Sequence, residues 1–236
     1  FVGLRNYQEL FFEDKLFWIS LYNTLYFTLF SVTLGTVWAI GLASLLNLKN
    51  VKGIAVYRTT YYLPSIVPLV AASVVWLWLF NPQYGIINTF LHYMGVPTIG
   101  WFTDPLWAKP AFVIMSLWGI GGAILIYLAG LQDVPQELYE AAALDGASGL
   151  QRFWHVTIPM VSPVILFNVI ISLIGSFQYF TQAYVITSGG PADSTLFYSL
   201  YLYNNAFSYY RMGYASALAW ILFLMVQVTT LLVLRT

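Results

Sequence analysis

The charged residues of this chain leave five long stretches that carry no charge. These stretches cover residues 16–48, 59–103, 110–132, 153–192 and 212–234. A helix crosses the hydrocarbon core of a membrane, about 30 Å thick, with roughly 20 apolar residues. Each stretch is long enough to cross a bilayer, and the sequence therefore predicts an all-α polytopic membrane protein.

The composition indicates the same class. Hydrophobic residues make up 60% and charged residues 8% of the 236 residues, whereas a soluble domain has about 25% charged residues. This composition excludes a soluble enzyme, a nucleic-acid-binding protein and a disordered chain. Cysteine is absent, so disulfides and thiolate chemistry are excluded as well.

Prolines and turn-forming residues divide the charge-free stretches into five expected spans. The expected spans cover residues 17–46, 64–80, 110–131, 159–186 and 212–234. Short helices are expected near residues 85–94 and 194–210, in two outer loops. The loop at residues 47–62 holds Lys49, Lys52 and Arg58 without an acid, which places it in the cytoplasm by the positive-inside rule.

Two regions follow from this topology. Residues 1–16 form an extracytoplasmic or interfacial segment, and residues 17–236 form the transmembrane domain. Because an odd number of spans places the chain ends on opposite sides, we expect one further amino-terminal helix in a longer parent protein. Six spans would then be the full complement.

The cytoplasmic loop at residues 132–159 is expected to form two short helices. The pairs Asp133–Gln136 and Ser148–Gln151 both have the spacing of a capping box, which starts a helix. Asp145-Gly146 is expected to end the first helix, and Pro159 to form a boundary after the second. An amphipathic hairpin on the lipid surface is one interpretation, but the first helix is acidic, which favours a protein partner.

The same loop resembles a known family. Glu140-Ala141-Ala142, Gly146 and Ile158-Pro159 fall at the spacings of EAA-x3-G-x9-I-x-L-P, the loop pattern of binding-protein-dependent ABC importer permeases. Val156 and Ile158 replace the Ile and Leu of that pattern. The resemblance implies that the loop docks on an ATPase. It assigns ATPase coupling to Glu140, Ala141, Ala142, Asp145, Gly146, Ile158 and Pro159.

Other segments extend the resemblance along the chain. Gly3–Tyr7, Leu63-Pro64, Ser188–Pro191 and Gly213–Ala217 resemble the carbohydrate-uptake branch, which includes maltose and glycerol-phosphate permease subunits. The implied fold is the six-helix core of a type I ABC importer permease, with five helices visible and the first missing. The implied location is the cytoplasmic or inner membrane of a bacterium or archaeon.

The resemblance also implies an assembly around this chain. Its members are a second permease subunit, a dimer of ATPase subunits, an extracytoplasmic solute-binding protein and the lipid bilayer; no nucleic acid takes part. The sequence contains no G-x-x-x-x-G-K-[ST] loop to hold ATP phosphates. This chain is therefore expected to be a transport subunit that binds no cofactor, while ATP and Mg²⁺ bind to the partner ATPase subunits.

One set of polar residues is a candidate for the solute pathway. Asn168, Ser172 and Ser176 lie at i, i+4 and i+8 of the fourth expected span, and Tyr179 is expected to continue that face. Polar groups in a membrane face protein or water, and sugars combine hydrogen bonding with aromatic stacking. The alternative interpretation is that these side chains only join neighbouring helices.

The class of solute and the mechanism leave alternatives. A neutral sugar is favoured because no Lys or Arg lies within the expected spans, with glycerol phosphate as the second candidate. An ATP-independent secondary transporter would need ionisable residues within the spans or an internal repeat, and the sequence has neither. A membrane-embedded enzyme would need a catalytic cluster, which the sequence also lacks.

Overall fold

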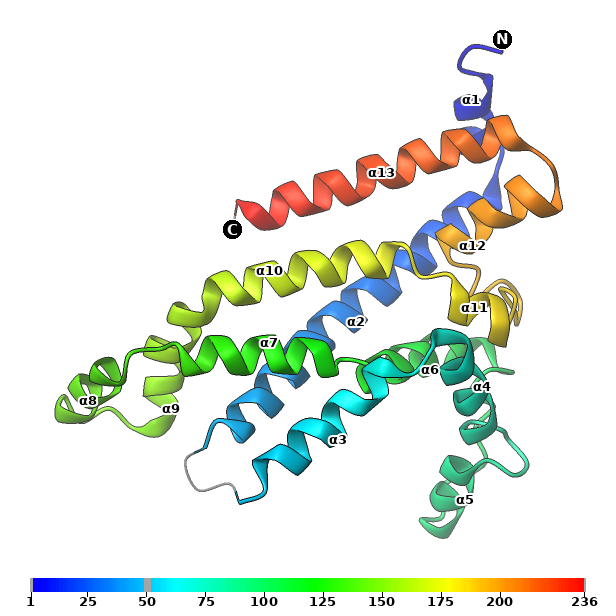
Figure 1. The fold of residues 1–236 in the computed structure, drawn as a ribbon. Coiled ribbons are helices and arrows are strands. Elements are labelled where there is room, and N and C mark those ends of the chain that lie inside the picture. Colours follow the sequence, from blue (N-terminus) through cyan, green and yellow to red (C-terminus); the bar gives the residue numbers. More distant parts are fainter. Residues whose placement is uncertain (1, 49–51, 236) are drawn as a thin grey trace. The chain divides into compact units, whose positions relative to one another are not determined.

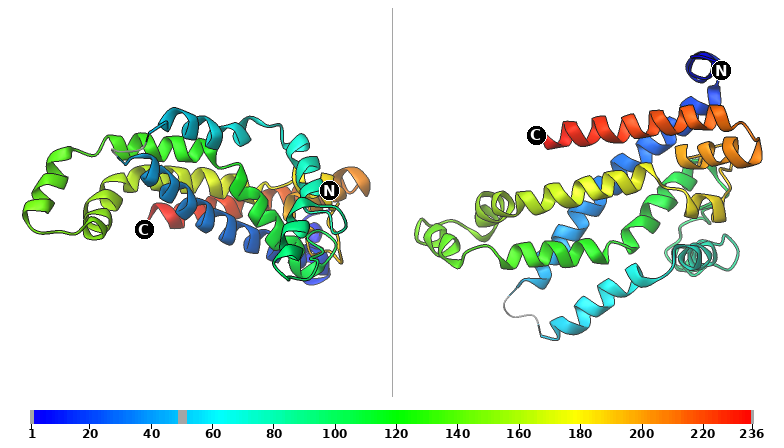
Figure 2. Two further views of the ribbon diagram at one scale, coloured as in Figure 1. Left: turned by 90° about the horizontal axis from the view of Figure 1, so that it is seen from below. Right: turned by 45° about the horizontal axis from the view of Figure 1, so that its top comes forward.

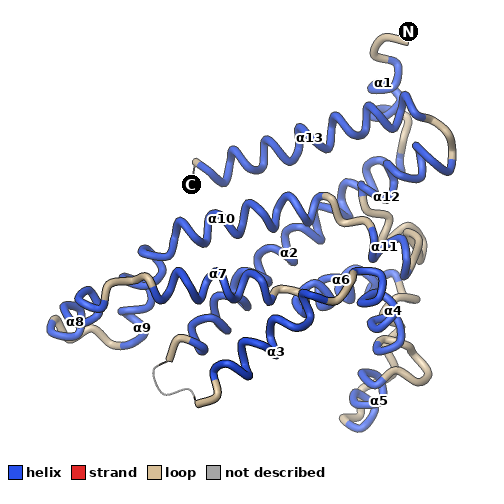
Figure 3. Tube along the Cα trace, viewed as in Figure 1, coloured by secondary structure: helices blue, strands red, loops and turns tan. Residues whose placement is uncertain are grey.

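The computed structural model describes residues 2–48 and 52–235, and every regular element in these residues is a helix (Figure 3). The prediction of an all-helical fold is confirmed. The elements are α1 Arg5–Phe12, α2 Lys15–Leu46, α3 Ile54–Ile66, α4 Leu69–Leu79, α5 Ile86–Tyr93, α6 Pro105–Trp118, α7 Gly121–Gln132, α8 Gln136–Leu144, α9 Gly149–Arg152, the π-helical turn η1 Phe153–Thr157, α10 Ile158–Phe177, α11 Thr181–Ile186, α12 Tyr198–Tyr203, the π-helical turn η2 Asn204–Ser208, and α13 Met212–Leu234.

Three helical stretches are individually long and apolar enough to cross a membrane. They are α2, the stretch Gly149–Ile186, and α13. Two helix pairs, α3 with α4 and α6 with α7, meet the same test together but are bent at a short break. By length and composition, the described residues thus hold three spans, or up to five if each bent pair is one span.

The second expected span begins differently in the structure. A helix was predicted from Pro64, after a loop at residues 47–62, but α3 already begins at Ile54 and contains Pro64 near its end. The break falls at Val67-Pro68 instead, because a residue that precedes proline is disfavoured in the helical conformation. The prediction of a loop is therefore wrong for residues 54–62, which belong to α3.

The basic residues of that region are only partly described. Lys49 lies outside the described residues. Lys52 is exposed just before α3, and Arg58 lies within α3. The expected short helices of the outer loops are confirmed as α5 and as α12 with η2.

The chain forms two compact units, drawn in Figures 1 and 2. The first unit contains the residues up to Ser31, Val67–Ser116 and the residues from Leu173 onward; the second contains Val32–Ile66 and Leu117–Ser172. The first unit thus holds α1, the start of α2, α4, α5, most of α6, and α11 to α13. The second holds the end of α2, α3, α7, the α8–α9 segment and most of α10.

Aromatic side chains form the core of the first unit. Phe27, Phe112 and Phe197 are at most 2% exposed, and their rings contact one another with centroids 5.4 and 5.7 Å apart. Buried Asn23 of α2 donates hydrogen bonds to the carbonyl oxygens of Asp193 and Leu196, at 2.8 and 3.2 Å. The two carbonyl groups belong to an irregular segment, where no helical hydrogen bond is available to them, and Asn23 satisfies them instead.

Asp14 joins the start of α2 to α12 and α13 in the same unit. Its Oδ1 accepts from the backbone N–H groups of Leu16 and Phe17, at 2.9 and 3.1 Å, and so caps α2. Its Oδ2 accepts from the hydroxyls of Tyr201 and Tyr214. Burial, together with the bond to Asp14, raises the pKa of Tyr201 to about 12.

Small residues allow close packing in the second unit. Ala39 and Ala43 of α2 are fully buried against Tyr127 and Leu128 of α7. At the start of α7, a Cβ atom added at Gly121 would lie 2.3 Å from the carbonyl oxygen of Tyr61 in α3. The contact between α3 and α7 therefore requires glycine at this position.

The neighbouring glycine provides a matched control for this contact. A Cβ atom added at Gly122 would meet nothing within 4 Å. We predict that Gly121→Ala lowers the free energy of unfolding by about 1–3 kcal/mol, the usual cost of overpacking, and the melting temperature of the purified protein in detergent by about 3 °C or more. Gly122→Ala should melt like the natural chain. Equal melting temperatures for the two variants would contradict the tight α3–α7 contact.

Candidate functional site

The α8–α9 hairpin is the candidate coupling element. Its first helix, α8, begins directly after Pro135, which is the N-cap residue and makes no side-chain capping bond. The predicted cap by Asp133 is therefore wrong: Asp133 instead closes α7 in helical conformation. Proline is tolerated at the start of a helix, because the N–H groups of the first turn have no partner within the helix and the missing N–H of proline costs no hydrogen bond.

The end of α8 matches the prediction. Gly146 has a φ of +80°, the left-handed conformation that favours glycine. Its N–H donates to the carbonyl oxygen of Ala143 at 3.1 Å, and the N–H of Ala147 donates to that of Ala142 at 2.9 Å. This pair of bonds is a Schellman motif, which ends the helix and turns the chain sharply.

The start of α9 also matches the prediction. Ser148 Oγ accepts from the N–H of Gln151 at 3.4 Å, and Gln151 Oε1 accepts from the N–H of Ser148 at 2.8 Å, which completes a capping box. The predicted boundary at Pro159 is present only as a change of helix type: the π-helical turn η1 ends at Thr157, and α10 begins at Ile158 with no loop between them. Pro159 is the second residue of α10.

A hydrogen bond joins the two arms of the hairpin. The hydroxyls of Tyr139 in α8 and Thr157 in η1 lie 2.9 Å apart and share a hydrogen bond. A cavity of about 260 Å³ adjoins them and is also lined by Ser44, Asn47 and Arg152. In Figures 1 and 2 the two arms lie next to each other beyond the end of α7. The hairpin is therefore a defined element rather than a mobile loop.

The surface of the hairpin is both apolar and acidic. Leu144 is 90% exposed, and Leu150 and Trp154 are 69% and 59% exposed. The side chains of Glu140 and Asp145 are exposed and form no ion pair with the described residues. Exposed apolar groups among unpaired acids are typical of a surface that another protein covers.

The remaining coupling candidates lie at different depths in this hairpin. Ala141, Gly146 and Pro159 are exposed, whereas Ala142 and Ile158 are half-buried. The described part of the chain holds no group of three or more His, Cys, Asp or Glu side chains that could bind a metal ion.

The solute-pathway candidates do not form one polar face. Asn168 is buried and donates to the carbonyl oxygen of Val164 at 3.0 Å; Ser176 is buried and donates to that of Leu173 at 2.9 Å. Ser172, between them in α10, is exposed. Each buried group thus has a hydrogen bond within its own helix.

Tyr179 does not continue the face of α10, because α10 ends at Phe177. Its ring is buried and lies 4.2 Å from that of Phe27 and 5.4 Å from that of Phe197, between ring centroids. Its hydroxyl is buried and has no hydrogen-bond partner among residues 2–48 and 52–235. The position of Tyr179 is determined by its packing into the aromatic core. The periodicity of the sequence does not reveal this packing.

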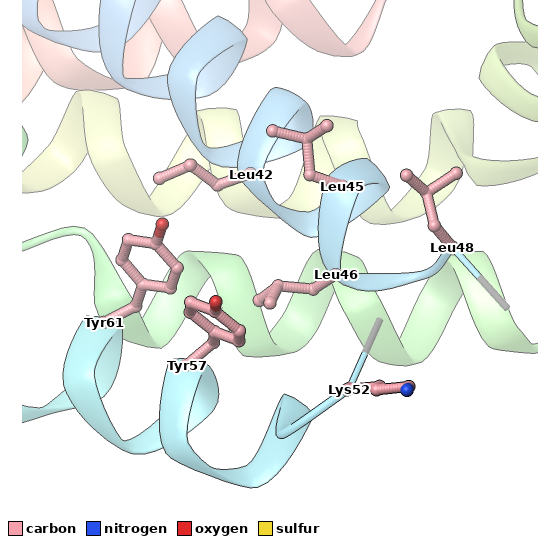
Figure 4. Close-up of a pocket in the computed structure, with 7 residues that line it drawn as sticks. All are labelled: Leu42, Leu45, Leu46, Leu48, Lys52, Tyr57 and Tyr61. Carbon is pink, nitrogen blue, oxygen red and sulfur yellow. The ribbon is translucent and has the colours of Figure 1, made fainter. Parts of the chain in front are cut away.

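A cleft of about 480 Å³ separates the end of α2 from α3 in the second unit (Figure 4). Leu42, Leu45 and Leu46 line one wall, and Tyr57 and Tyr61 line the other. Leu48 and Lys52 complete its lining, so the cleft combines leucine side chains with the polar groups of a lysine and two tyrosines.

The sequence analysis did not identify one cluster of aromatic residues. Phe180 and Tyr184 are four residues apart, as are Tyr203 and Phe207, and the four rings are in contact. This repeated spacing of four, on either side of the Gly-Pro turn at 190–191, is the signal that could have revealed them.

Comparison with known proteins gives one consistent result. Residues 22–235 match the family described as "Binding-protein-dependent transport system inner membrane component". The chain is 41% identical to the probable ABC transporter permease protein YesP of Bacillus subtilis, over 100% of this chain and 77% of YesP. It is 39% identical to the lactose transport system permease protein LacF of Rhizobium radiobacter, over 98% of this chain and 79% of LacF.

A solved structure shares the fold. A chain of a bacterial ABC transporter that imports the acidic polysaccharide alginate matches with a TM-score of 0.87 at 24% identity, over 100% of this chain and 83% of that chain. The helical fold, the loop pattern and these matches agree: the chain belongs to the family of inner-membrane components of binding-protein-dependent transport systems, and it is an ABC transporter permease.

Proposed function

We propose that this chain is the permease subunit of an ATP-driven importer of sugars and forms the translocation pathway with a second permease subunit. The observation that carries the proposal is the α8–α9 hairpin, whose turn is fixed by local motifs at Gly146 and Ser148 and which presents exposed Leu144, Leu150 and Trp154. Surrounding acids suit a basic cleft on a separate ATPase subunit. An extracytoplasmic binding protein delivers the sugar, and the partner ATPase dimer binds ATP and Mg²⁺.

A rigid hairpin is what energy coupling requires. To shift a transporter from 1:99 to 99:1 between two conformations needs about 5.5 kcal/mol of differential binding. Nucleotide-driven closure of the ATPase subunits supplies this energy, and only a hairpin that does not deform can pass it to the membrane helices. The Schellman motif at Gly146 and the capping box at Ser148 provide that rigidity.

Sugar is the proposed solute because LacF, a relative at 39% identity, is named for lactose transport. Four basic residues do lie in candidate spans, contrary to the expectation. They are Lys15 at the start of α2, Arg58 in α3, Lys109 in α6 and Arg152 in α9. The ammonium of Lys109 is already engaged, since it donates to Asn23 Oδ1 at 3.0 Å and lies 4.8 Å from the ring centre of Tyr22. Glycerol phosphate, which would favour a free cation, remains the second candidate.

The turn at Gly146 tests the coupling role. Valine at a φ of +80° costs at least about 1–2 kcal/mol, so Gly146→Val should deform the hairpin and reduce sugar uptake about tenfold. Gly149→Val is the matched control, because Gly149 also has open space around it but no positive φ. Both variants are assembled into the complete transporter in proteoliposomes, and uptake is measured together with ATP hydrolysis.

The coupling proposal expects Gly146→Val to lose uptake and the ATP hydrolysis that loaded binding protein stimulates, while all subunits still assemble. Near-normal uptake by a fully assembled Gly146→Val transporter would contradict the proposal.

The solute-pathway role of Asn168 and Tyr179 is tested separately. Asn168→Ala and Tyr179→Phe each remove one polar group, and we predict that each lowers the uptake rate at saturating loaded binding protein. Thr229→Ala is the control for Asn168, because Thr229 also bonds the carbonyl oxygen four residues before it, that of Met225, at 2.8 Å. If Asn168→Ala and Thr229→Ala transport equally well, Asn168 only packs between helices.

A further inference from the structure

Four aromatic rings of the first unit form a continuous cluster, here called the aromatic quartet: Phe180, Tyr184, Tyr203 and Phe207. Ring centroids lie 5.4 Å apart for Phe180–Tyr184, at an angle of 21° that is close to parallel. Tyr203 lies 4.9 Å from Phe180 and 5.5 Å from Tyr184, and Phe207 lies 5.1 Å from Tyr203. Residues of α11 and of α12–η2, far apart in the sequence, thus build one aromatic surface.

The quartet is not part of the aromatic core. Tyr184 and Phe207 are 45% and 56% exposed, whereas the core rings of Phe112 and Phe197 are fully buried. An exposed, preformed cluster of aromatic rings leaves flat apolar faces open to a partner. Something outside the described chain is therefore expected to cover it.

Several polar side-chain groups in and next to the quartet form no hydrogen bond with the described residues. Within the described residues, no interaction is recorded for the side-chain amides of Gln178, Gln182 and Asn204 or for the hydroxyls of Tyr184 and Tyr203. These groups supply both donors and acceptors. Residues 178–210 include one charged side chain, Asp193, so the surface offers hydrogen bonds and flat apolar faces but hardly any charge.

We propose that the aromatic quartet is a binding site for a neutral sugar, at which sugar released by the binding protein is held before it enters the membrane. A sugar ring has an apolar C–H face that stacks on an aromatic ring and hydroxyls that bond to amides and phenols. This inference rests on the proposed function as a sugar importer and adds a second site to it, distinct from Asn168 and Tyr179.

The position of the quartet in the chain agrees with this role. It follows α10, whose 20 residues span about 30 Å, the thickness of the hydrocarbon core. If the hairpin before α10 docks on the ATPase in the cytoplasm, the residues after α10 face the side from which the binding protein delivers sugar. A belt of aromatic residues at the lipid surface is the rival explanation, but such a belt requires neither ring stacking nor unpaired amides.

The test uses the complete transporter in proteoliposomes with binding protein loaded with lactose, maltose or trehalose in turn. Tyr184→Leu and Tyr203→Leu remove one ring each but keep an apolar side chain. Tyr93→Leu is the control, because Tyr93 is 84% exposed and has no ring contact among the described residues. The quantity measured is the number of sugar molecules imported per ATP hydrolysed.

We expect each quartet variant to lower this ratio about fivefold, consistent with the loss of one stacking contact, while ATP hydrolysis stimulated by loaded binding protein stays within about twofold. Tyr184→Phe, which keeps the ring, should restore most of the ratio, and Tyr93→Leu should not change it.

Three results would overturn the sugar site. The ratio could stay unchanged in the quartet variants, or fall equally in Tyr93→Leu, which would indicate a lipid-facing belt. Stimulated ATP hydrolysis could fall in parallel with import, which would indicate docking of a protein partner. Failure of the natural transporter to import any of the three sugars would instead contradict the proposed function itself, and with it this site.

Discussion

The absence of water from the hydrocarbon core is the constraint on which this structure depends. A peptide group there has to bond within its own segment, so the chain crosses the hydrocarbon core as helices. Several polar side chains within the helices obey the same constraint. Asn168, Ser176 and Thr229 each bond a carbonyl oxygen three or four residues earlier in their own helix, so each is satisfied without a partner helix.

Irregular backbone occurs where side chains compensate for it. The segment at residues 193–198 interrupts the helices of the first unit, and Asn23 and Thr24 of α2 supply bonds to its peptide groups. Asp14 similarly accepts from two peptide groups and two tyrosine hydroxyls. Polar chemistry is thereby concentrated at helix ends, and the proposed functional elements, the hairpin and the aromatic quartet, are also located there.

Local signals predicted the hairpin well because its geometry is local. The left-handed glycine at 146 and the capping box at Ser148 each depend on residues fewer than six positions apart. The prediction that Asp133 caps α8 was wrong because α8 begins only after Pro135, which is its N-cap residue. The start of α3 was predicted wrongly because charged residues were taken to lie outside the helix. Helices extend beyond the apolar core of a membrane, so charged residues can belong to their ends.

Some residues take positions that depend on tertiary packing and that could not be predicted from the sequence. Nothing between Phe177 and Thr181 is a glycine or a proline, yet the helix breaks there and Tyr179 enters the aromatic core. The same break orients Phe180 toward Tyr203, which follows 23 residues later. The spacing of four within each pair predicts the contacts Phe180–Tyr184 and Tyr203–Phe207. The contact between the two pairs depends on the approach of distant helices, which such a spacing does not predict.

Contact between the hairpin and an ATPase subunit is the central claim, and cross-linking tests it most directly. The chain has no cysteine, so a photoreactive group can be attached at a single introduced site, Leu144→Cys on the hairpin or Tyr93→Cys on α5 as control. In the complete transporter, Leu144→Cys should cross-link to the ATPase subunit with a yield that ATP changes, and Tyr93→Cys should not. Cross-linking of Leu144→Cys to lipid alone would contradict the account.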